Sequence, residues 1–187
     1  MKTGLRDNNK GFSLIELLVV IGILALMLGM FLLSTNVIGR TAARQCSKQL
    51  RHELEQVRVA SMGKNKVTLW LYKDSATGKI MVQQITTIAN IGDGAGTTPV
   101  DGEVREVGSA RVTLDFVSSV DATRTPLDSD GIYFEFNRST GAFKKVKYSE
   151  LGGQIHDEYT IKEIYMTGGG LTEQLTLHGI TGKVTED

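Results

Sequence analysis

A long apolar segment lies near the N-terminus of the chain. From Phe12 to Leu33 the sequence reads FSLIELLVVIGILALMLGMFLL, 22 residues in which Glu16 is the only charged member. Because a helix rises about 1.5 Å per residue, this segment would extend about 33 Å and cross a bilayer core of about 30 Å. The pattern therefore predicts a membrane-spanning helix over residues 12–33.

After this segment the apolar residues form a stripe with helical period. The stripe repeats on average every 18/5, or 3.6, residues and consists of Ala43, Cys46, Leu50, Leu54, Val57 and Ser61. The other face is basic and carries Arg40, Arg44, Lys48, Arg51 and Arg58, with Glu55 four residues after Arg51. We predict that residues 34–63 continue the helix. Its apolar stripe would lie on a β-sheet, and its basic face would lie in solvent or, in an assembly, against an acidic neighbour.

From residue 64 onward the apolar residues alternate with a period of two, which is typical of β-strands. The predicted strands are Val67–Tyr72, Lys79–Ile85, Ala110–Val117, Ile132–Phe136, Ala142–Tyr148, Tyr159–Met166 and Glu173–His178. Turns are expected at Asp74–Gly78, Asn137–Gly141 and Gly168–Gly170, and a glycine-rich loop at residues 90–102. One long helix packed on a head of antiparallel strands, residues 64–187, predicts an α+β fold.

The bulk composition excludes few functions. The 187 residues carry a formal net charge of zero, so nothing in the overall charge points to nucleic acid or acidic membranes. Residues 1–11 are locally basic, with Lys2, Arg6 and Lys10 against Asp7. This basic flank predicts a cytoplasmic N-terminus and a head on the other side of the membrane. Cys46 is the single cysteine, so the chain cannot form an intrachain disulfide. We interpret Cys46 as a small apolar residue of the helix.

The junction before the apolar segment differs from an ordinary secretory signal. Such a signal has a shorter apolar region, followed by a small-residue cleavage site. Here a glycine precedes the apolar run instead, in the sequence Lys10-Gly11-Phe12. Glycine gives a peptidase access to an extended backbone and separates the polar leader from the helix.

Glu16 is the second unusual feature, since an ionised side chain inside hydrocarbon costs roughly 2.5–3.5 kcal/mol. If the chain were cut after Gly11, Phe12 would carry a new α-amino group one helical turn from Glu16. A neighbouring helix in an assembly could also place its own amine against this carboxylate. The alternative is a plain signal anchor that tolerates a glutamate near the interface.

The stretch from Lys10 to Val20, KGFSLIELLVV, resembles the processing motif of type IV pilins and type II secretion pseudopilins. The resemblance implies cleavage after Gly11 by a prepilin peptidase that also methylates the amine of Phe12. It implies too that Glu16 helps to set the register of each new subunit in a filament. Pilins often carry a helix-breaking proline in this segment, and here only Gly22 and Gly29 could permit local melting.

Shorter stretches resemble the GspH/FimT-type minor pseudopilins. They are residues 54–69, residues 136–141 and residues 180–184, whereas residues 74–130 fit no pattern of that group. This resemblance implies a minor pseudopilin of a secretion pseudopilus or a type IV pilus-like filament for protein secretion. The implied partners are other pilins, the prepilin peptidase, an assembly ATPase with its platform protein, and the membrane. The implied location is the cytoplasmic membrane and then a periplasmic or cell-surface filament.

No arrangement of residues indicates an enzyme, a cofactor or a metal. His52, His156 and His178 share no metal-ligand spacing, and no serine lies in a GxSxG context. The glycine-rich residues 92–96 lack the GK[ST] of a phosphate loop. Asp128 and Asp130 match part of a calcium loop, and a turn before a strand is the alternative.

Basic and aromatic residues alternate in the predicted hairpin at residues 132–148. Arg138, Lys144, Lys145 and Lys147 are the basic members, and such interleaving can bind single-stranded nucleic acid. A minor pilin that binds DNA during DNA uptake is therefore the alternative function. Strand alternation offers a simpler account, with aromatic side chains inward and lysines outward.

Overall fold

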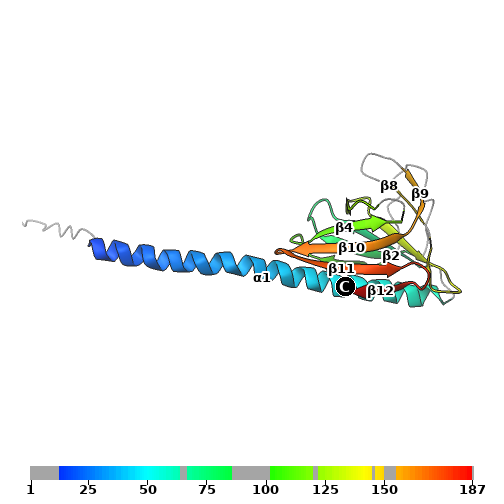
Figure 1. Cartoon of the computed structure of the whole chain (residues 1–187), viewed down its shortest axis with the longest axis horizontal. Coiled ribbons are helices and arrows are strands. Elements are labelled where there is room, and N and C mark those ends of the chain that lie inside the picture. Colours follow the sequence, from blue (N-terminus) through cyan, green and yellow to red (C-terminus); the bar gives the residue numbers. More distant parts are fainter. Residues whose placement is uncertain are drawn as a thin grey trace, which may run out of the picture. The chain divides into compact units, whose positions relative to one another are not determined.

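The computed structural model describes residues 13–63, 67–85, 102–119, 122–144, 146–149 and 155–186, without the side chains of residues 31–35, 146–149 and 155–159. The chain divides into two compact units, residues 1–35 and residues 36–187. The helix α1 (Leu14–Ser61) contributes to both units (Figure 1). The predicted leader, residues 1–11, and Phe12 lie outside the described residues.

The helix predicted from the apolar segment and the stripe is confirmed as one element of 48 residues. It begins after Ser13, whose carbonyl oxygen accepts hydrogen bonds from the backbone N–H groups of Glu16 (3.0 Å) and Leu17 (3.2 Å). It ends at Ser61, two residues before the predicted end at residue 63. Within the part of the chain that the structure describes, no helix combines the length and the apolarity needed to cross a membrane.

The residues after α1 form antiparallel strands, as predicted. The first sheet contains β1 (Thr68–Lys73), β2 (Ile80–Ile85), β3 (Val104–Gly108), β6 (Ile132–Phe136) and β7 (Phe143–Lys144), in the order β3-β2-β1-β6-β7. The second contains β4 (Thr113–Ser118), β5 (Thr125–Pro126), β10 (Ile161–Gly168), β11 (Leu171–His178) and β12 (Lys183–Glu186), in the order β12-β11-β10-β4-β5. A separate hairpin pairs β8 (Val146–Ser149) with β9 (Ile155–Tyr159). The described head therefore has two main sheets, where the sequence suggested one.

Several strand boundaries differ from the prediction. The predicted strand Ala110–Val117 begins at Thr113, because residues 110 and 111 form a turn. The predicted strand Ala142–Tyr148 splits after Lys144, where the chain leaves β6 and pairs with β9. Tyr159 ends β9 and does not begin β10. The short strands β3, β5, β9 and β12 were not predicted. Most of the predicted loop at residues 90–102 lies outside the described residues.

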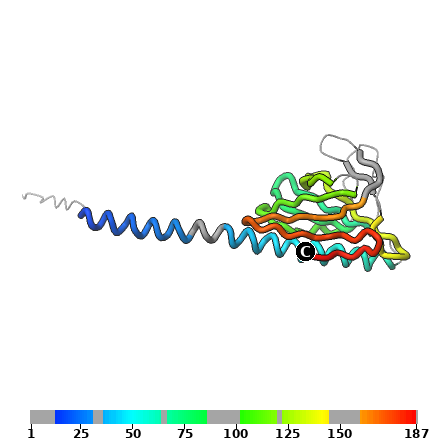
Figure 2. The backbone as a smooth tube through the Cα atoms, in the orientation of Figure 1, coloured from blue at the N-terminus to red at the C-terminus, as the bar shows by residue number. Residues whose placement is uncertain are grey.

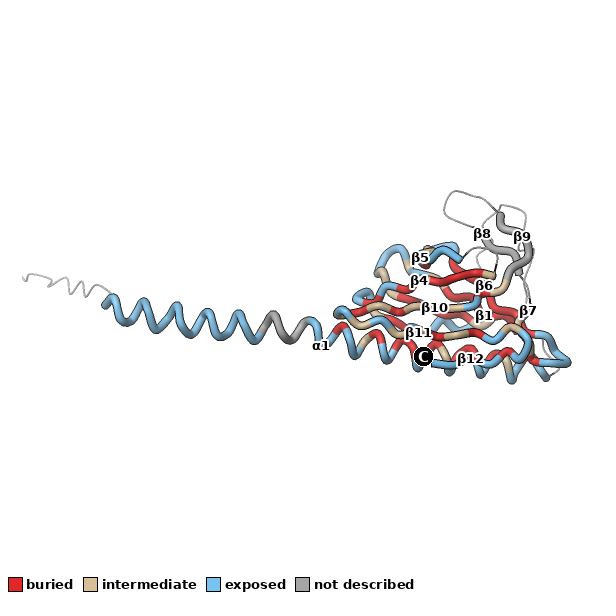
Figure 3. Tube along the Cα trace, viewed as in Figure 1, coloured by how far each residue is buried: buried red, intermediate tan, exposed pale blue. Residues whose placement is uncertain are grey.

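The predicted helical stripe forms one side of the core. Ala43, Cys46, Leu50, Leu54 and Val57 are 0 % exposed and Ser61 is 1 % exposed. They face apolar side chains of both sheets, among them Leu69, Leu71, Ile132, Ile164, Met166 and Leu175. Figure 3 shows this buried face along the head part of α1. Each fully buried Leu or Val contributes about 1.5–3 kcal/mol relative to exposure, so this stripe holds the helix on the head.

The strands at one end of each sheet order, β3 and β12, lie close to the helix. A Cβ added to Gly108 of β3 would lie 2.8 Å from the Cys46 sulfur, which shows how closely α1 approaches that strand. On the other flank the Ser47 hydroxyl donates to the Glu186 carboxylate of β12 at 3.5 Å. The C-terminal strand therefore lies beside α1 (Figure 2).

Candidate functional site

The N-terminal part of α1 exposes apolar side chains on every side. Between Leu14 and Met30 the large apolar residues are all exposed, from 48 % for Val20 to 80 % for Leu14 (Figure 3). A helix that is apolar all round is stable only where other molecules cover it, as in a bilayer or inside an assembly. This stretch is therefore a candidate binding surface, whose chemistry suits hydrocarbon or another apolar helix.

Glu16 is the only charged residue between Ser13 and Met30, and it is exposed in the first turn of α1. The backbone N–H groups at a helix N-terminus carry partial positive charge, which stabilises a nearby carboxylate by about 0.3–1 kcal/mol. Ser13 and Glu16 also have the spacing of a capping box, in which each side chain can bond the other residue's backbone N–H. The Ser-x-x-Glu spacing is visible in the sequence, although a capping box was not predicted from it.

The processing residues Gly11 and Phe12 lie outside the described residues. Their assignment, like the assembly role of Glu16, stays a prediction. What the structure adds is the start of the helix at Leu14, two residues after Phe12.

The basic face of α1 is largely exposed, as predicted, and its arginines also contact the head. Nε of Arg40 donates to the Gly169 carbonyl oxygen at 3.1 Å. Likewise, Nε of Arg58 donates to the Gly141 carbonyl oxygen at 3.2 Å. Two further arginines make ion pairs: Arg44 with Glu173 at 3.3 Å, and Arg51 with both Glu55 at 3.2 Å and Glu186 at 3.9 Å. Exposed pairs of this kind contribute at most about 1 kcal/mol each, so they orient the helix more than they hold it.

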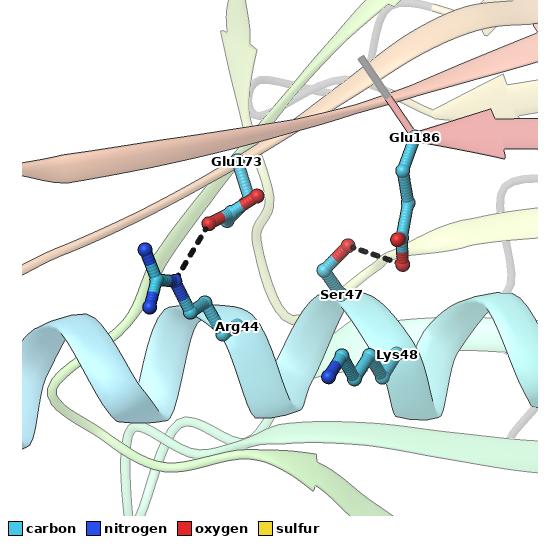
Figure 4. A pocket seen from close by; sticks show the side chains of 5 residues that line it. All are labelled: Arg44, Ser47, Lys48, Glu173 and Glu186. Carbon is cyan, nitrogen blue, oxygen red and sulfur yellow. Dashed lines mark hydrogen bonds and ion pairs between the residues drawn. The ribbon is translucent and has the colours of Figure 1, made fainter.

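A shallow pocket of about 290 Å³ lies along this flank of α1 (Figure 4). Its lining consists of Arg44, Ser47, Lys48, Glu173 and Glu186. Lys48 has no ion-pair partner within the described part of the chain. Two cations and two carboxylates leave the lining without net charge, so it offers no attraction to an anionic polymer.

The candidate nucleic-acid residues are only partly described. Lys144 pairs with Glu135 at 3.0 Å, so its charge is largely balanced. Phe134 and Phe136 are buried in the core, and Phe143 packs on Phe136 with ring centroids 4.6 Å apart. Lys145 and the side chain of Lys147 lie outside the described residues. In the described part, the aromatic rings are therefore used in packing, as strand alternation suggested.

The other candidates for chemistry also have structural roles. Asp128 accepts hydrogen bonds from the backbone N–H groups of Asp130 (3.1 Å) and Gly131 (2.9 Å), which makes it a turn residue. The described residues contain no group of three or more His, Cys, Asp or Glu placed to hold a metal ion. Cys46 is buried, and desolvation raises its pKa from 9.0 to about 12, as expected of a packed thiol.

His52 and His178 are exposed and bond Gln56 and Thr185, respectively, whereas the side chain of His156 lies outside the described residues. Neither histidine belongs to a group of potential metal ligands within the described part of the chain.

Among comparisons with known proteins, only the one with family models gave a match, and that match lies at the N-terminus. A search of curated proteins found no match, and neither did a search of solved structures. Residues 6–32 match the family model described as the prokaryotic N-terminal methylation motif. The match covers residues 6–11 of the basic leader, the Gly11-Phe12 junction, Glu16 and most of the apolar segment. Proteins with this motif are structural subunits that assemble with other pilins. The match indicates a type IV pilin-like protein, of the group that includes the pseudopilins.

Proposed function

We propose that the protein is a minor pseudopilin of the GspH/FimT kind that is built into a type II secretion pseudopilus or a type IV pilus-like filament for protein secretion. A prepilin peptidase cuts after Gly11 and methylates the amine of Phe12. The observation that carries the proposal is the apolar surface of Leu14–Met30, exposed on every side and interrupted only by Glu16.

In this proposal the chain has four segments with different roles. Residues 1–11 are the basic leader, which stays in the cytoplasm and is removed. Residues 12–33 anchor the subunit in the cytoplasmic membrane and later lie in the filament core. Residues 34–63 continue the helix along the head, and residues 64–187 form the head outside the membrane. An assembly ATPase and its platform protein move the subunit from the bilayer into the filament.

Glu16 favours the movement of the subunit from the bilayer into the filament. Lipid tails are as apolar as leucine, so moving apolar side chains from lipid to a helix bundle yields little hydrophobic free energy. An unpaired carboxylate in hydrocarbon costs roughly 2.5–3.5 kcal/mol, and pairing with the Phe12 amine of a neighbouring subunit removes much of that cost. The assembled state is therefore favoured over the isolated membrane state by the charge pair.

Substitutions of Glu16 test the role of the pair. Glu16→Gln keeps a side chain that can complete the capping box but removes the charge, whereas Glu16→Ala removes both. We expect both variants to insert in the membrane, and both to enter filaments about 10- to 100-fold less than the wild type, because 1.4 kcal/mol is a factor of ten. Quantitative immunoblotting of sheared filaments and of membranes gives the ratio. Normal incorporation of Glu16→Gln would refute the pairing, and a defect confined to Glu16→Ala would assign Glu16 to capping alone.

The alternative is a minor pilin that binds DNA during DNA uptake. Its support is the sequence pattern of Lys144, Lys145 and Lys147, and the ion pair of Lys144 with Glu135 weakens it. The triple substitution of these lysines by Gln separates the two functions. Reduced DNA uptake with normal secretion would favour the alternative, and the reverse would remove it.

A further inference from the structure

The turn between β6 and β7 carries the one Asn-x-Ser/Thr sequence of the chain. It reads Asn137-Arg138-Ser139, and none of the other asparagines has a serine or threonine two residues later. With a residue other than proline in the middle, this sequence is the acceptor for N-linked glycans on surface loops of exported proteins. Because so short a sequence also arises by chance, the geometry of the turn decides whether it can serve as an acceptor.

The backbone of this turn is held on its inner side. The N–H group of Asn137 donates to the Ala142 carbonyl oxygen at 2.8 Å, and the N–H group of Gly141 donates to the Asn137 carbonyl oxygen at 2.8 Å. Gly141 has a φ of 67°, which glycine adopts without strain. Arg58 of α1 donates to the Gly141 carbonyl oxygen at 3.2 Å. The turn is therefore fixed on the head, while residues 137–140 are all exposed.

The side chain of Asn137 is oriented by Ser139. Its Oδ1 accepts hydrogen bonds from the Ser139 backbone N–H at 3.0 Å and from the Ser139 hydroxyl at 2.8 Å. This arrangement is an Asx turn. Both bonds end on the oxygen, so the amide nitrogen Nδ2 has no partner among the residues that the structure describes. The atom to which an N-linked glycan is attached is therefore free, on an exposed residue.

The exposed side of the turn has room for a bulky group. In the described part of the chain, the side chains of Arg138, Ser139 and Thr140 bond no other element. The Ser139 hydroxyl bonds Asn137, and the Thr140 hydroxyl accepts from the Ala142 backbone N–H at 3.2 Å. A glycan on Asn137 would extend into solvent without displacing a packed side chain.

We propose that Asn137 is an N-glycosylation site, modified by a membrane oligosaccharyltransferase from a lipid-linked oligosaccharide pyrophosphate. A bond forms between Nδ2 of Asn137 and C1 of the first sugar, and the bond between C1 and the pyrophosphate oxygen breaks. The lipid pyrophosphate leaves with the electron pair, and the Nδ2 proton passes to a base of the transferase. The Ser139 hydroxyl, by donating to Oδ1, makes that proton more acidic.

The inference rests on the proposed function, because glycan transfer takes place on the side of the membrane to which the head is exported. It also adds a constraint on assembly. A glycan is bulky and hydrophilic, so it excludes close packing of protein at this turn. The β6–β7 turn must then lie on the outer surface of a filament.

Mass spectrometry of the full chain, extracted from membranes of the cells that naturally make it, tests the site. Chymotrypsin cleaves after Phe136 and Phe143, and so releases the peptide Asn137–Phe143. We expect this peptide to carry the mass of one oligosaccharide on Asn137. An unmodified wild-type peptide would overturn the proposal.

Four variants identify the atom that carries the sugar. Asn137→Gln and Ser139→Ala each remove the acceptor sequence, so both should lose the added mass and migrate faster than the wild type in gels. Ser139→Thr keeps the acceptor sequence and should retain the mass. Thr140→Ala is the matched control, because it removes a hydroxyl from the same turn outside that sequence. Added mass that persists in Asn137→Gln, or is lost in Thr140→Ala, would place the sugar on a hydroxyl and overturn the proposal.

The N-terminal peptide of the same digest separates this inference from the proposed function. A chain that begins at methylated Phe12 but has an unmodified Asn137 would overturn the glycan and leave the proposed function intact. A glycosylated Asn137 in a chain that keeps residues 1–11 would support the site and contradict the proposed processing. An unmodified Asn137 in a chain that keeps residues 1–11 would contradict both.

Discussion

Replacement of Gly39 by alanine sets two well-defined effects against each other. In an exposed helix interior, Gly→Ala stabilises by about 0.8–1.0 kcal/mol, because alanine restricts the unfolded backbone. At Gly39, however, an added Cβ would lie 2.5 Å from the backbone nitrogen of Gly169 and 2.8 Å from its Cα. Both atoms belong to the backbone of the β10–β11 turn, which cannot rotate away as a side chain could.

The steric cost of a Cβ at Gly39 exceeds the gain in helix propensity. Relief requires α1 and the turn to separate by about 1 Å, and overpacking of this kind costs typically 1–3 kcal/mol. Separation would also strain the bond from Arg40 to the Gly169 carbonyl oxygen and loosen Gly168 from Ala43, whose Cβ a side chain on Gly168 would meet at 3.3 Å. After the helix-propensity gain is subtracted, we expect a net loss of about 1–2 kcal/mol.

Urea unfolding of the full chain in detergent measures this loss. Trp70 is the only tryptophan, is 9 % exposed and stacks on Tyr72 with ring centroids 3.9 Å apart, so its fluorescence reports unfolding of the head. Gly179→Ala is the control, because nothing lies within 4 Å of an added Cβ there. A Gly39→Ala variant as stable as the wild type, or more so, would refute the reasoning.

Three further outcomes are expected. Leu50→Ala should lower the free energy of unfolding by about 2–5 kcal/mol in the same urea assay, whereas Gln49→Ala should change it by less than about 0.5 kcal/mol. Burial raises the pKa of Cys46 from 9.0 to about 12, so between these two pH values the thiol is deprotonated in the unfolded chain but still protonated in the folded one. The free energy of unfolding should therefore fall as the pH rises through this range. Cys46→Ala should flatten that part of the stability–pH curve. Glu53→Gln should lower the melting temperature, because Glu53 is buried and pairs with Arg105 at 3.1 Å. If the difference in melting temperature between variant and wild type does not shrink in high salt, the effect does not come from charge.

The helix was the most predictable part of the fold. A period of 3.6 residues from Ala43 to Ser61 identified the buried stripe, because side-chain burial imposes that period directly on the sequence. Strands with clear alternation, such as β1 and β6, were predicted for the same reason.

The missed strands lack such a signal. In β3 only the last two residues are buried, so its apolar residues do not alternate. The two-residue strand β5 ends in Pro126, and the division between β7 and β8 depends on pairing with β9 rather than on local sequence. The partners of the basic helix face were equally hidden, since Arg40 and Gly169 are 129 residues apart in the sequence.

Of the candidate site, the sequence predicted the residues but not their surroundings. The motif from Lys10 to Val20 identified Gly11, Phe12 and Glu16, because a charge and a glycine within an apolar run are conspicuous.

The central claim is that the chain is processed as a pilin, and the mass of the mature N-terminus tests it most directly. The protein is extracted from the membranes of cells that make it, digested, and its N-terminal peptide is analysed by tandem mass spectrometry. The account predicts a peptide that begins at Phe12 and carries one methyl group on its α-amine. A mature protein that retains residues 1–11, or begins at any residue other than Phe12, would contradict it.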